Sequence, residues 1–190
     1  LSYVNCNNLG SQIILNGFAE VVNCSLDFDL DCFDDEARSL VSLFKPSVVE
    51  SLNGPCDAAA SIAEVTGTFN LFTSDTIVNL PRLATVGTIS AFYSQVNTIS
   101  LPSLTTVRFG ATFYYNLQLS SLDISSLQSV GGILDLRTNQ LTQLNVSSLI
   151  NVGPFAASGN KLTSIAFSPQ LGEIADTESG TQGYLRLDEN

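Results

Sequence analysis

Three aspartates near the start of the chain have the residue type and spacing to bind a metal ion. Asp27, Asp29 and Asp31 alternate with apolar residues, so on a strand their carboxylates would share one face. Clustered oxygens suit Ca²⁺. The segment is not an EF-hand, because Cys32 stands where that loop needs Gly and Arg38 stands where it needs Glu. We expect a solvated strand face and no bound metal.

The rest of the chain contains few residues that could act in catalysis. The 190 residues contain no His, which excludes Ser-His-Asp and Cys-His catalysis and the common zinc sites. A glycosidase needs two facing carboxylates. The acids of the later chain, chiefly Asp75, Asp123 and Asp135, show no evident pairing. We therefore expect that the protein is not an enzyme and needs no cofactor.

The overall composition excludes some classes of binding partner. Lys and Arg total 7 against 18 Asp and Glu, a net charge of −11, which repels nucleic acid and anionic membrane surfaces. Hydrophobic residues make up 44%, enough for a full core, yet no run of 18 apolar residues could span a membrane. Ser, Thr and Asn cover the surface in place of charges, as in extracellular β-proteins. The absence of Met indicates a processed form or a fragment.

Four cysteines, Cys6, Cys24, Cys32 and Cys56, lie in the first third of the chain. An even, clustered set predicts two disulfides and a secreted protein, with free thiols as the alternative. A zinc site does not fit, because no CxxC pair occurs. Two glycosylation sequons begin at Asn23 and Asn145, in agreement with secretion. Asn145 could instead be a plain turn residue.

Aromatic residues recur in the middle of the chain, at Tyr93 and at Phe113, Tyr114 and Tyr115. Aromatic side chains in successive repeats could form a sugar-binding strip. Since alternate side chains of a strand point to opposite faces, about half of them should lie in the core instead. We expect core packing and ladder packing between successive coils to be their main role.

These residues sit within a repeat. Segments of the form L-P-x-L-x-x-V-G recur with a period of about 22, and leucine-rich repeats have a period of about 20–29 residues. The second apolar residue of the segments is Leu83, Leu104, Leu127, Leu149 and Leu171. Gly after the Val allows a tight backbone turn.

Each repeat also carries two short apolar stretches that read as strands. The first set is 69–71, 89–91, 133–136 and 155–157, and the second is 96–101, 122–124, 144–146 and 162–165. An Asn recurs between them, at Asn97, Asn116, Asn139 and Asn160. Stacked coils would pair these strands in parallel and bury a continuous core.

The motif L-P-x-L-x-x-V-G, then an apolar strand, then N-x-L-x-x-L, resembles the receptor L-domain family over about residues 57–190. Relatives occur in insulin-type and epidermal-growth-factor-type receptor ectodomains and in fungal GPI-anchored cell-wall proteins. The resemblance implies a right-handed parallel β-solenoid, a surface location and no catalysis.

The first 56 residues predict an N-terminal half-coil, a disulfide-rich segment and one helix over 33–44. Apolar residues there fall on one helical face, and Pro46 would end the helix. The helix would cover the end of the solenoid of residues 57–190, forming a single structural unit. Segments 4–6 and 22–24 both resemble 144–146, which favours the pairs Cys6–Cys24 and Cys32–Cys56 among three connectivities.

The two ends of the chain look complementary. Residues 183–190 match the first half of a repeat, 132–139, and residues 1–9 match the second half, 141–149. One reading is a piece cut from a longer repeat protein. In the other, the tail of one molecule docks on the head of the next and builds a filament. The docking residues would be Leu1, Tyr3, Val4, Tyr184, Leu185 and Leu187.

Two functions follow from this sequence. The first is an extracellular structural protein that stacks head to tail into a fibre or a cell-wall layer. The second is an adhesion or recognition module for carbohydrate or surface proteins. A large exposed apolar or aromatic patch on one face would favour the second function.

Overall fold

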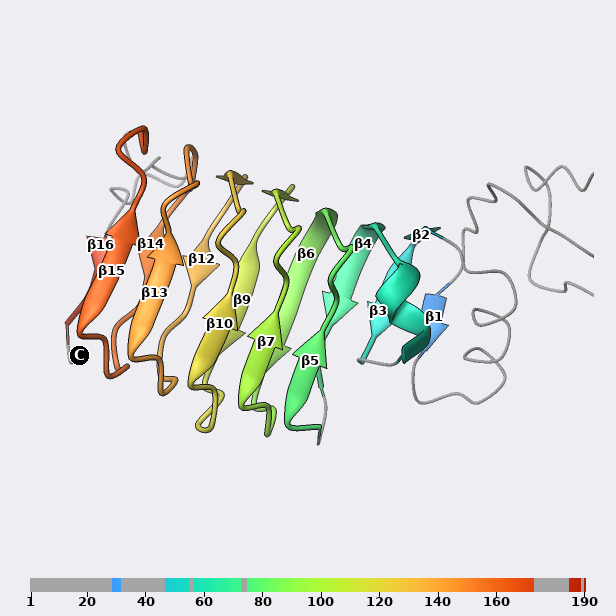
Figure 1. Ribbon diagram of the computed structural model, residues 1–190, viewed down its shortest axis with the longest axis horizontal. Helices are drawn as coiled ribbons and strands as arrows, with labels where there is room; N and C mark the ends of the chain where they lie inside the picture. Colours follow the sequence, from blue (N-terminus) through green and yellow to red (C-terminus); the bar gives the residue numbers. More distant parts are fainter. Residues whose placement is uncertain (1–28, 32–46, 55–56, 73–74, 173–184, 189) are drawn as a thin grey trace, which may run out of the picture.

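The fold, in a computed structural model, is a parallel β-solenoid described over residues 29–31, 47–54, 57–72, 75–172, 185–188 and 190. Successive coils add one strand to each of two layers that face each other (Figure 1). The prediction of a mainly-β parallel solenoid is confirmed. The predicted helix over 33–44 and the four cysteines lie outside the described residues. The helix that is described, η2 (Asp57–Ser61), is a short 3₁₀ segment.

One layer is an 11-stranded parallel sheet that runs the length of the solenoid. Its main strands, in spatial order, are β1 (Asp29–Asp31), β3 (Ser51–Asn53), β4 (Glu64–Asn70), β6 (Thr85–Phe92), β9 (Ala111–Tyr114), β12 (Leu134–Asp135), β14 (Phe155–Ala156) and β16 (Leu185–Arg186). Three short strands join it at one corner: β2 (Val48–Val49), β8 (Thr106–Val107) and β11 (Ser129–Val130). We call this layer the long sheet.

The opposite layer is divided into two smaller parallel sheets. One contains β5 (Ile77–Asn79), β7 (Thr98–Ser100) and β10 (Ser121–Asp123). The other contains β13 (Gln143–Val146) and β15 (Ser164–Phe167). Strands β10 and β13 are neighbours in Figure 1 but belong to different sheets. We call this layer, which lies in front in Figure 1, the front layer. It is interrupted between β10 and β13, whereas the long sheet is continuous.

The core lies between the layers and is built from the residues that the repeat predicts. Leu83, Leu104, Leu127 and Leu149 are fully or almost fully buried, and Leu171 packs against them at the edge. Register partners on adjacent strands of successive coils, from β4 to β15, are 20 to 23 residues apart. The predicted period and the predicted inward faces are thus both present in the fold.

Glycine follows the repeat Val in three coils, as Gly87, Gly131 and Gly153, whereas Arg108 stands there in the coil between the first two. A β-carbon added to Gly131 would collide with the backbone carbonyl oxygen of Arg108 in the preceding coil. At the next residue, Gly132, the added carbon would lie 2.6 Å from the carbonyl oxygen of Phe109. At these glycines the coils can therefore stack at hydrogen-bonding distance because no side chain lies between them.

The C-terminal segment adds a further strand to the long sheet. Strand β16 pairs with β14, and Leu185 lies opposite Phe155. Leu134, the residue that the sequence alignment equates with Leu185, also lies opposite Phe155, on its other side. Leu187 packs against the core as a partly buried side chain. Leu1, Tyr3, Val4 and Tyr184, the other predicted docking residues, lie outside the described residues.

Candidate functional site

Aromatic side chains gather where the strands of the long sheet end. Phe92 of β6 lies opposite Tyr114 of β9, and both are partly exposed. Phe72, 47% exposed, precedes them in the same row, and Tyr93, 65% exposed, follows Phe92. Tyr115 completes the group, which we call the aromatic cluster: Phe72, Phe92, Tyr93, Tyr114 and Tyr115.

The rings of the aromatic cluster touch one another in an unbroken series. The centroids of Phe72 and Phe92 are 4.8 Å apart with perpendicular ring planes, and those of Tyr93 and Tyr115 are also 4.8 Å apart. Phe92 contacts Tyr93 at 5.9 Å and Tyr114 contacts Tyr115 at 5.6 Å. These separations fall within the favourable range for aromatic pairs. The cluster is therefore one continuous surface that spans three coils.

Two of these tyrosines have an unfavourable backbone conformation. Tyr93 has φ of 55° and Tyr115 has φ of 59°, in the left-handed region. For a residue with a β-carbon this conformation costs about 1–2 kcal/mol. It also breaks the alternation of the strand, so the neighbours Tyr114 and Tyr115 are both partly exposed while Phe113 is buried. Phe113 packs in the core, and the rings of Tyr93, Tyr114 and Tyr115 contact one another between two coils.

The left-handed turn leads directly into a buried polar ladder. The Oδ1 atom of Asn116 accepts hydrogen bonds from the backbone N and the Oγ of Ser94, at 3.0 and 2.9 Å. One coil further, Asn139 Oδ1 accepts from Asn116 N at 2.9 Å. Asn160 continues the series by donating to the Leu136 carbonyl. These bonds satisfy backbone groups inside the turn, so the asparagines serve the fold.

The alignment of Asn97 with this ladder is wrong. Ser94, 7% exposed, takes the ladder position in its coil. Asn97 is exposed, and its carbonyl accepts hydrogen bonds from Ser120 N and Ser121 N. A serine can replace the asparagine because its hydroxyl also bonds to the next Asn, and a search for Asn alone overlooks it.

A second row of side chains runs beside the aromatic cluster on the same outer face. Ser90 lies opposite Asn70 and Thr112, and Thr112 lies opposite Asp135. We call Asn70, Ser90, Thr112 and Asp135 the polar row. Because Ser90 and Phe92 are two residues apart on one strand, the polar row and the cluster share a face.

An arginine links the polar row to the rings. Arg137 binds Asp135 through two hydrogen bonds, Nε to Oδ1 at 2.8 Å and Nη2 to Oδ2 at 2.6 Å. The guanidinium carbon lies 5.3 Å from the centre of the Tyr114 ring, within cation–π range. Asp135 is 5% exposed, so this pair is held in place and its charges offset each other.

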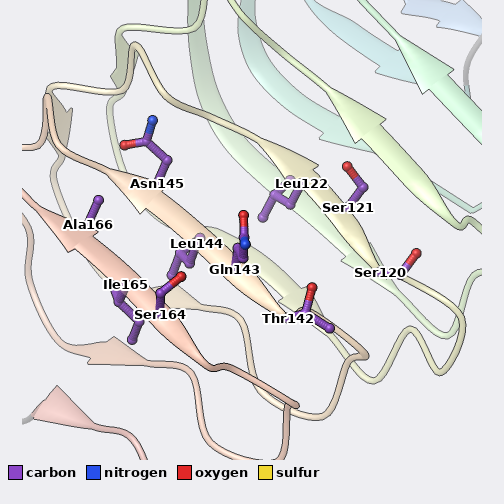
Figure 2. Close-up of a pocket in the computed structure, with 10 residues that line it drawn as sticks. All are labelled: Ser120, Ser121, Leu122, Thr142, Gln143, Leu144, Asn145, Ser164, Ile165 and Ala166. Atoms are coloured by element: carbon purple, nitrogen blue, oxygen red, sulfur yellow. The ribbon is translucent and has the colours of Figure 1, made fainter.

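The front layer carries a different feature, an open groove of about 490 Å³ where β10 and β13 separate. Figure 2 shows Asn145 at one end and Ser120 and Thr142 at the other. None of the ten residues that line the groove is charged. Hydroxyl and amide groups on an apolar floor can hold water or a polar ligand, but they supply no acid, base or nucleophile pair.

Other predicted site residues are spread over the fold. Asp29 and Asp31 lie on strand β1, as expected, and Asp27 lies outside the described residues. Within the described part of the chain, no group of three or more His, Cys, Asp or Glu could hold a metal ion. Asp123 accepts hydrogen bonds from the backbone and hydroxyl of Ser125, and Asp75 is exposed.

The sequon asparagine Asn145 is exposed on β13. Its Oδ1 accepts a hydrogen bond from Ser147 N at 3.1 Å, the bond that Asp123 makes with Ser125 one coil earlier. Asn145 therefore is a turn residue and is also accessible from solvent. The other sequon, at Asn23, lies outside the described residues.

Comparison with known proteins adds no assignment. No protein-family model, no curated protein and no solved structure matches the chain. No helix of the described residues is both long and apolar enough to cross a membrane.

Proposed function

We propose that the protein is a non-catalytic recognition module of the cell surface, and that the aromatic cluster is its binding surface. One observation carries this proposal. Tyr93 keeps a 65% exposed ring on a backbone that disfavours any residue with a side chain. Equivalent turns later in the chain use Thr138 at φ of 57° and Gly159 at φ of 68°, neither of which carries an aromatic ring. Strain that persists at an exposed position is a reason to infer function.

The continuity of the surface fits binding better than chance exposure. Single exposed hydrophobic residues are normal on a soluble protein, whereas contiguous patches mark interaction sites. The aromatic cluster joins five rings in series. Its neighbour, the polar row, supplies hydrogen-bonding groups on the same face. A few polar groups beside an apolar surface are the usual makeup of a ligand site.

Adhesion tests this proposal directly. We would measure binding of the full chain to extracellular matrix prepared from the source organism, with Tyr93→Gly as the test variant. Glycine removes the ring and suits the left-handed turn, so the fold should persist while binding falls. Phe109→Ser is the matched control, because Phe109 is also 65% exposed but lies just before the start of β9, whereas the cluster residues Tyr114 and Tyr115 lie at its end. Equal binding by wild type and Tyr93→Gly would contradict the proposal.

We also propose that the chain is extracellular and N-glycosylated at Asn145. The exposed side chain on β13 supports this, and its partner across the strand pair, Ala166, is small. A glycan there would cover the front layer and leave the long sheet free. Expression through a secretory pathway should give a product whose mass falls on treatment with an amidase for N-glycans. In the Asn145→Gln variant, the same treatment should remove no mass from this site.

We propose as well that the solenoid is right-handed and related to receptor L domains, as the repeat motif suggests. Stacking of such units head to tail is the second candidate function. It is supported by the continuity of the long sheet, whose outermost described strands are β1 and β16. Negative-stain microscopy of the native material tests it: filaments would support stacking, and isolated particles at high concentration would contradict it.

A further inference from the structure

We infer that the ligand of the aromatic cluster is a neutral carbohydrate chain. Its sugar rings stack on Phe92, Tyr93 and Tyr114, and its hydroxyls bond to Ser90 and Thr112. This inference rests on the proposed recognition function and names its ligand class. It follows from four features of the outer face of the long sheet: ring stacking, free hydroxyls, balanced charge and fixed geometry.

Stacking is the first feature. A pyranose ring presents C–H groups on its flat faces, and the face of an aromatic ring is electronegative. The two therefore attract each other when they lie face to face. Phe92 and Tyr114 are directly opposite on adjacent parallel strands, about 4.8 Å apart at the backbone. Phe72 extends the row on one side, so consecutive sugars could use consecutive coils.

Free hydroxyl groups are the second feature. Ser90 and Thr112 lie opposite each other in the same two strands, two residues before Phe92 and Tyr114. Both side chains are partly exposed. Within the described residues, neither side-chain hydroxyl takes part in a hydrogen bond to the protein. A sugar that stacks on the rings would hold its own hydroxyls beside these two, which can both donate and accept.

Charge is the third feature, and it indicates a neutral ligand. The chain as a whole carries −11, which disfavours sulfated or uronic-acid polymers. Arg137, the cation in contact with the cluster, is already paired with Asp135. Because Arg137 is paired, its positive charge is not available to bind an anionic sugar. The Asp135 carboxylate is likewise not available to bind a cationic peptide.

The area of the cluster argues against a protein as the ligand. A stable protein interface buries about 800 Å² on each partner. An aromatic side chain offers about 200 Å² in total. Tyr93 is 65% exposed, Phe72 is 47% exposed and the other three rings are only partly exposed. The cluster thus supplies well under the area of such an interface, but enough for a few sugar rings.

Fixed geometry is the fourth feature. Tyr93 and Tyr115 are held by left-handed turns, and those turns are fastened by the buried bonds of Ser94 and Asn116. Rings that are already in place lose little conformational freedom when a ligand binds. This small loss of conformational entropy matters most for a weakly interacting ligand such as a sugar.

A glycan array followed by calorimetry tests the inference. The full chain would be screened against neutral plant, fungal and animal oligosaccharides, with oligogalacturonate and heparin fragments as anionic probes. Binding can also be followed by tyrosine emission, because the chain has no Trp and three of its 5 Tyr belong to the cluster. We expect a neutral oligosaccharide to bind.

The variants assign binding to this surface. Tyr93→Gly should weaken the affinity for that oligosaccharide roughly tenfold, as expected for loss of one stacking ring. Ser90→Ala with Thr112→Val should weaken it about fivefold by removing two hydrogen bonds. Phe109→Ser should bind as the wild type does. Circular dichroism of each variant checks that the fold is intact.

The outcomes separate this inference from the proposed function. If adhesion to matrix depends on Tyr93, but no neutral glycan binds and protease treatment of the matrix removes adhesion, the ligand is a protein and the carbohydrate inference is wrong. Binding of anionic probes alone overturns it as well. If neither adhesion nor sugar binding depends on Tyr93, both the inference and the proposed function are wrong.

Discussion

The same backbone turn occurs in four successive coils, with different side chains in the two halves of the solenoid. In the earlier coils the residue at the turn is Tyr93 or Tyr115, and in the later coils it is Thr138 or Gly159. All four have φ between 55° and 68°. The residue that follows is always the buried polar residue of the ladder, Ser94 in the first coil and Asn in the other three.

This comparison separates the demands of folding from those of function. The ladder residues are alike in both halves because each coil must satisfy its buried backbone groups. The turn residue has no such constraint beyond its φ angle, and glycine meets that constraint at the lowest energy. Three of the four turns nevertheless carry a residue with a β-carbon, Tyr93, Tyr115 and Thr138, so strain alone does not single out the tyrosines. What sets the tyrosines apart is an aromatic ring that stays partly or mostly exposed, which the turn itself does not require.

The largest loss of stability is expected for a variant of the buried polar ladder, which both halves of the solenoid share. Asn139→Ala removes the acceptor for Asn116 N and the donors to the carbonyls of Phe113 and Leu136. Asn139 is 1% exposed, so water cannot replace these bonds without opening the coil. We expect the free energy of unfolding to fall by about 3 kcal/mol, measured by urea denaturation. A loss below about 1 kcal/mol would show that the ladder does not hold the turns.

The repeat and its strands could be predicted from the sequence because the signal is periodic. Leu83, Leu104, Leu127 and Leu149 recur at the spacing of the coils, and all are buried. The aromatic cluster could not be predicted in the same way. Strand alternation places Tyr115 on the inner side with Phe113, and the left-handed turn that brings it outward has no sequence signature, because Tyr rarely adopts it. The register that aligns Phe92 with Tyr114 also emerges only from the fold.

The second prediction places the turn residue of the early coils in a late coil. Gly159→Tyr places the aromatic residue of the early coils in a late coil, at φ of 68°. The new β-carbon would lie 3.4 Å from Thr138 Oγ1, and the three atoms nearest to it all belong to Thr138. We expect a loss of about 1–2 kcal/mol in unfolding free energy, measured by denaturant titration. Gly159→Ala is the control, since it adds the strain without the ring. If Gly159→Tyr were as stable as the wild type, the turn would impose no strain, and the argument from Tyr93 would fail.

The third prediction concerns the boundary between the halves, where Arg137 replaces an aromatic residue in the row. Asp135→Asn removes the ion pair with Arg137 but keeps an oxygen for the bond from Arg137 N. Because Arg137 is 34% exposed and its charge can be solvated, we expect a loss of about 1 kcal/mol in unfolding free energy. Arg137→Lys is the companion variant, since it keeps the charge without the two-bond fork. A gain in stability for Asp135→Asn would mean that burial of the carboxylate outweighs its pairing.

The smallest change in stability is expected where the effect on binding is largest. Tyr93→Gly relieves a left-handed conformation worth about 1 kcal/mol, and glycine returns a similar amount through the greater freedom of the unfolded chain, about 0.5–1 kcal/mol. The ring is 65% exposed, but its loss also removes the contacts with Phe92, Tyr114 and Tyr115, which at an exposed site we count at the low end of the range for aromatic pairs, about 0.5 kcal/mol. The net change should therefore be a loss of about 0.5 kcal/mol, measured by urea denaturation.

Tyr93→Ala supplies the decisive contrast with that variant. Alanine also lacks the ring but keeps the strained β-carbon, which costs about 1–2 kcal/mol, and it avoids the entropy loss of about 0.5–1 kcal/mol that glycine brings. It should therefore be less stable than Tyr93→Gly by about 0.5 kcal/mol, while both lose binding equally. That pattern would place strain in the backbone and recognition in the ring, as two separable properties of one residue. If Tyr93→Gly instead lost as much stability as Asn139→Ala, the tyrosine would be part of the scaffold, and the two halves of the solenoid would differ only in how they fold.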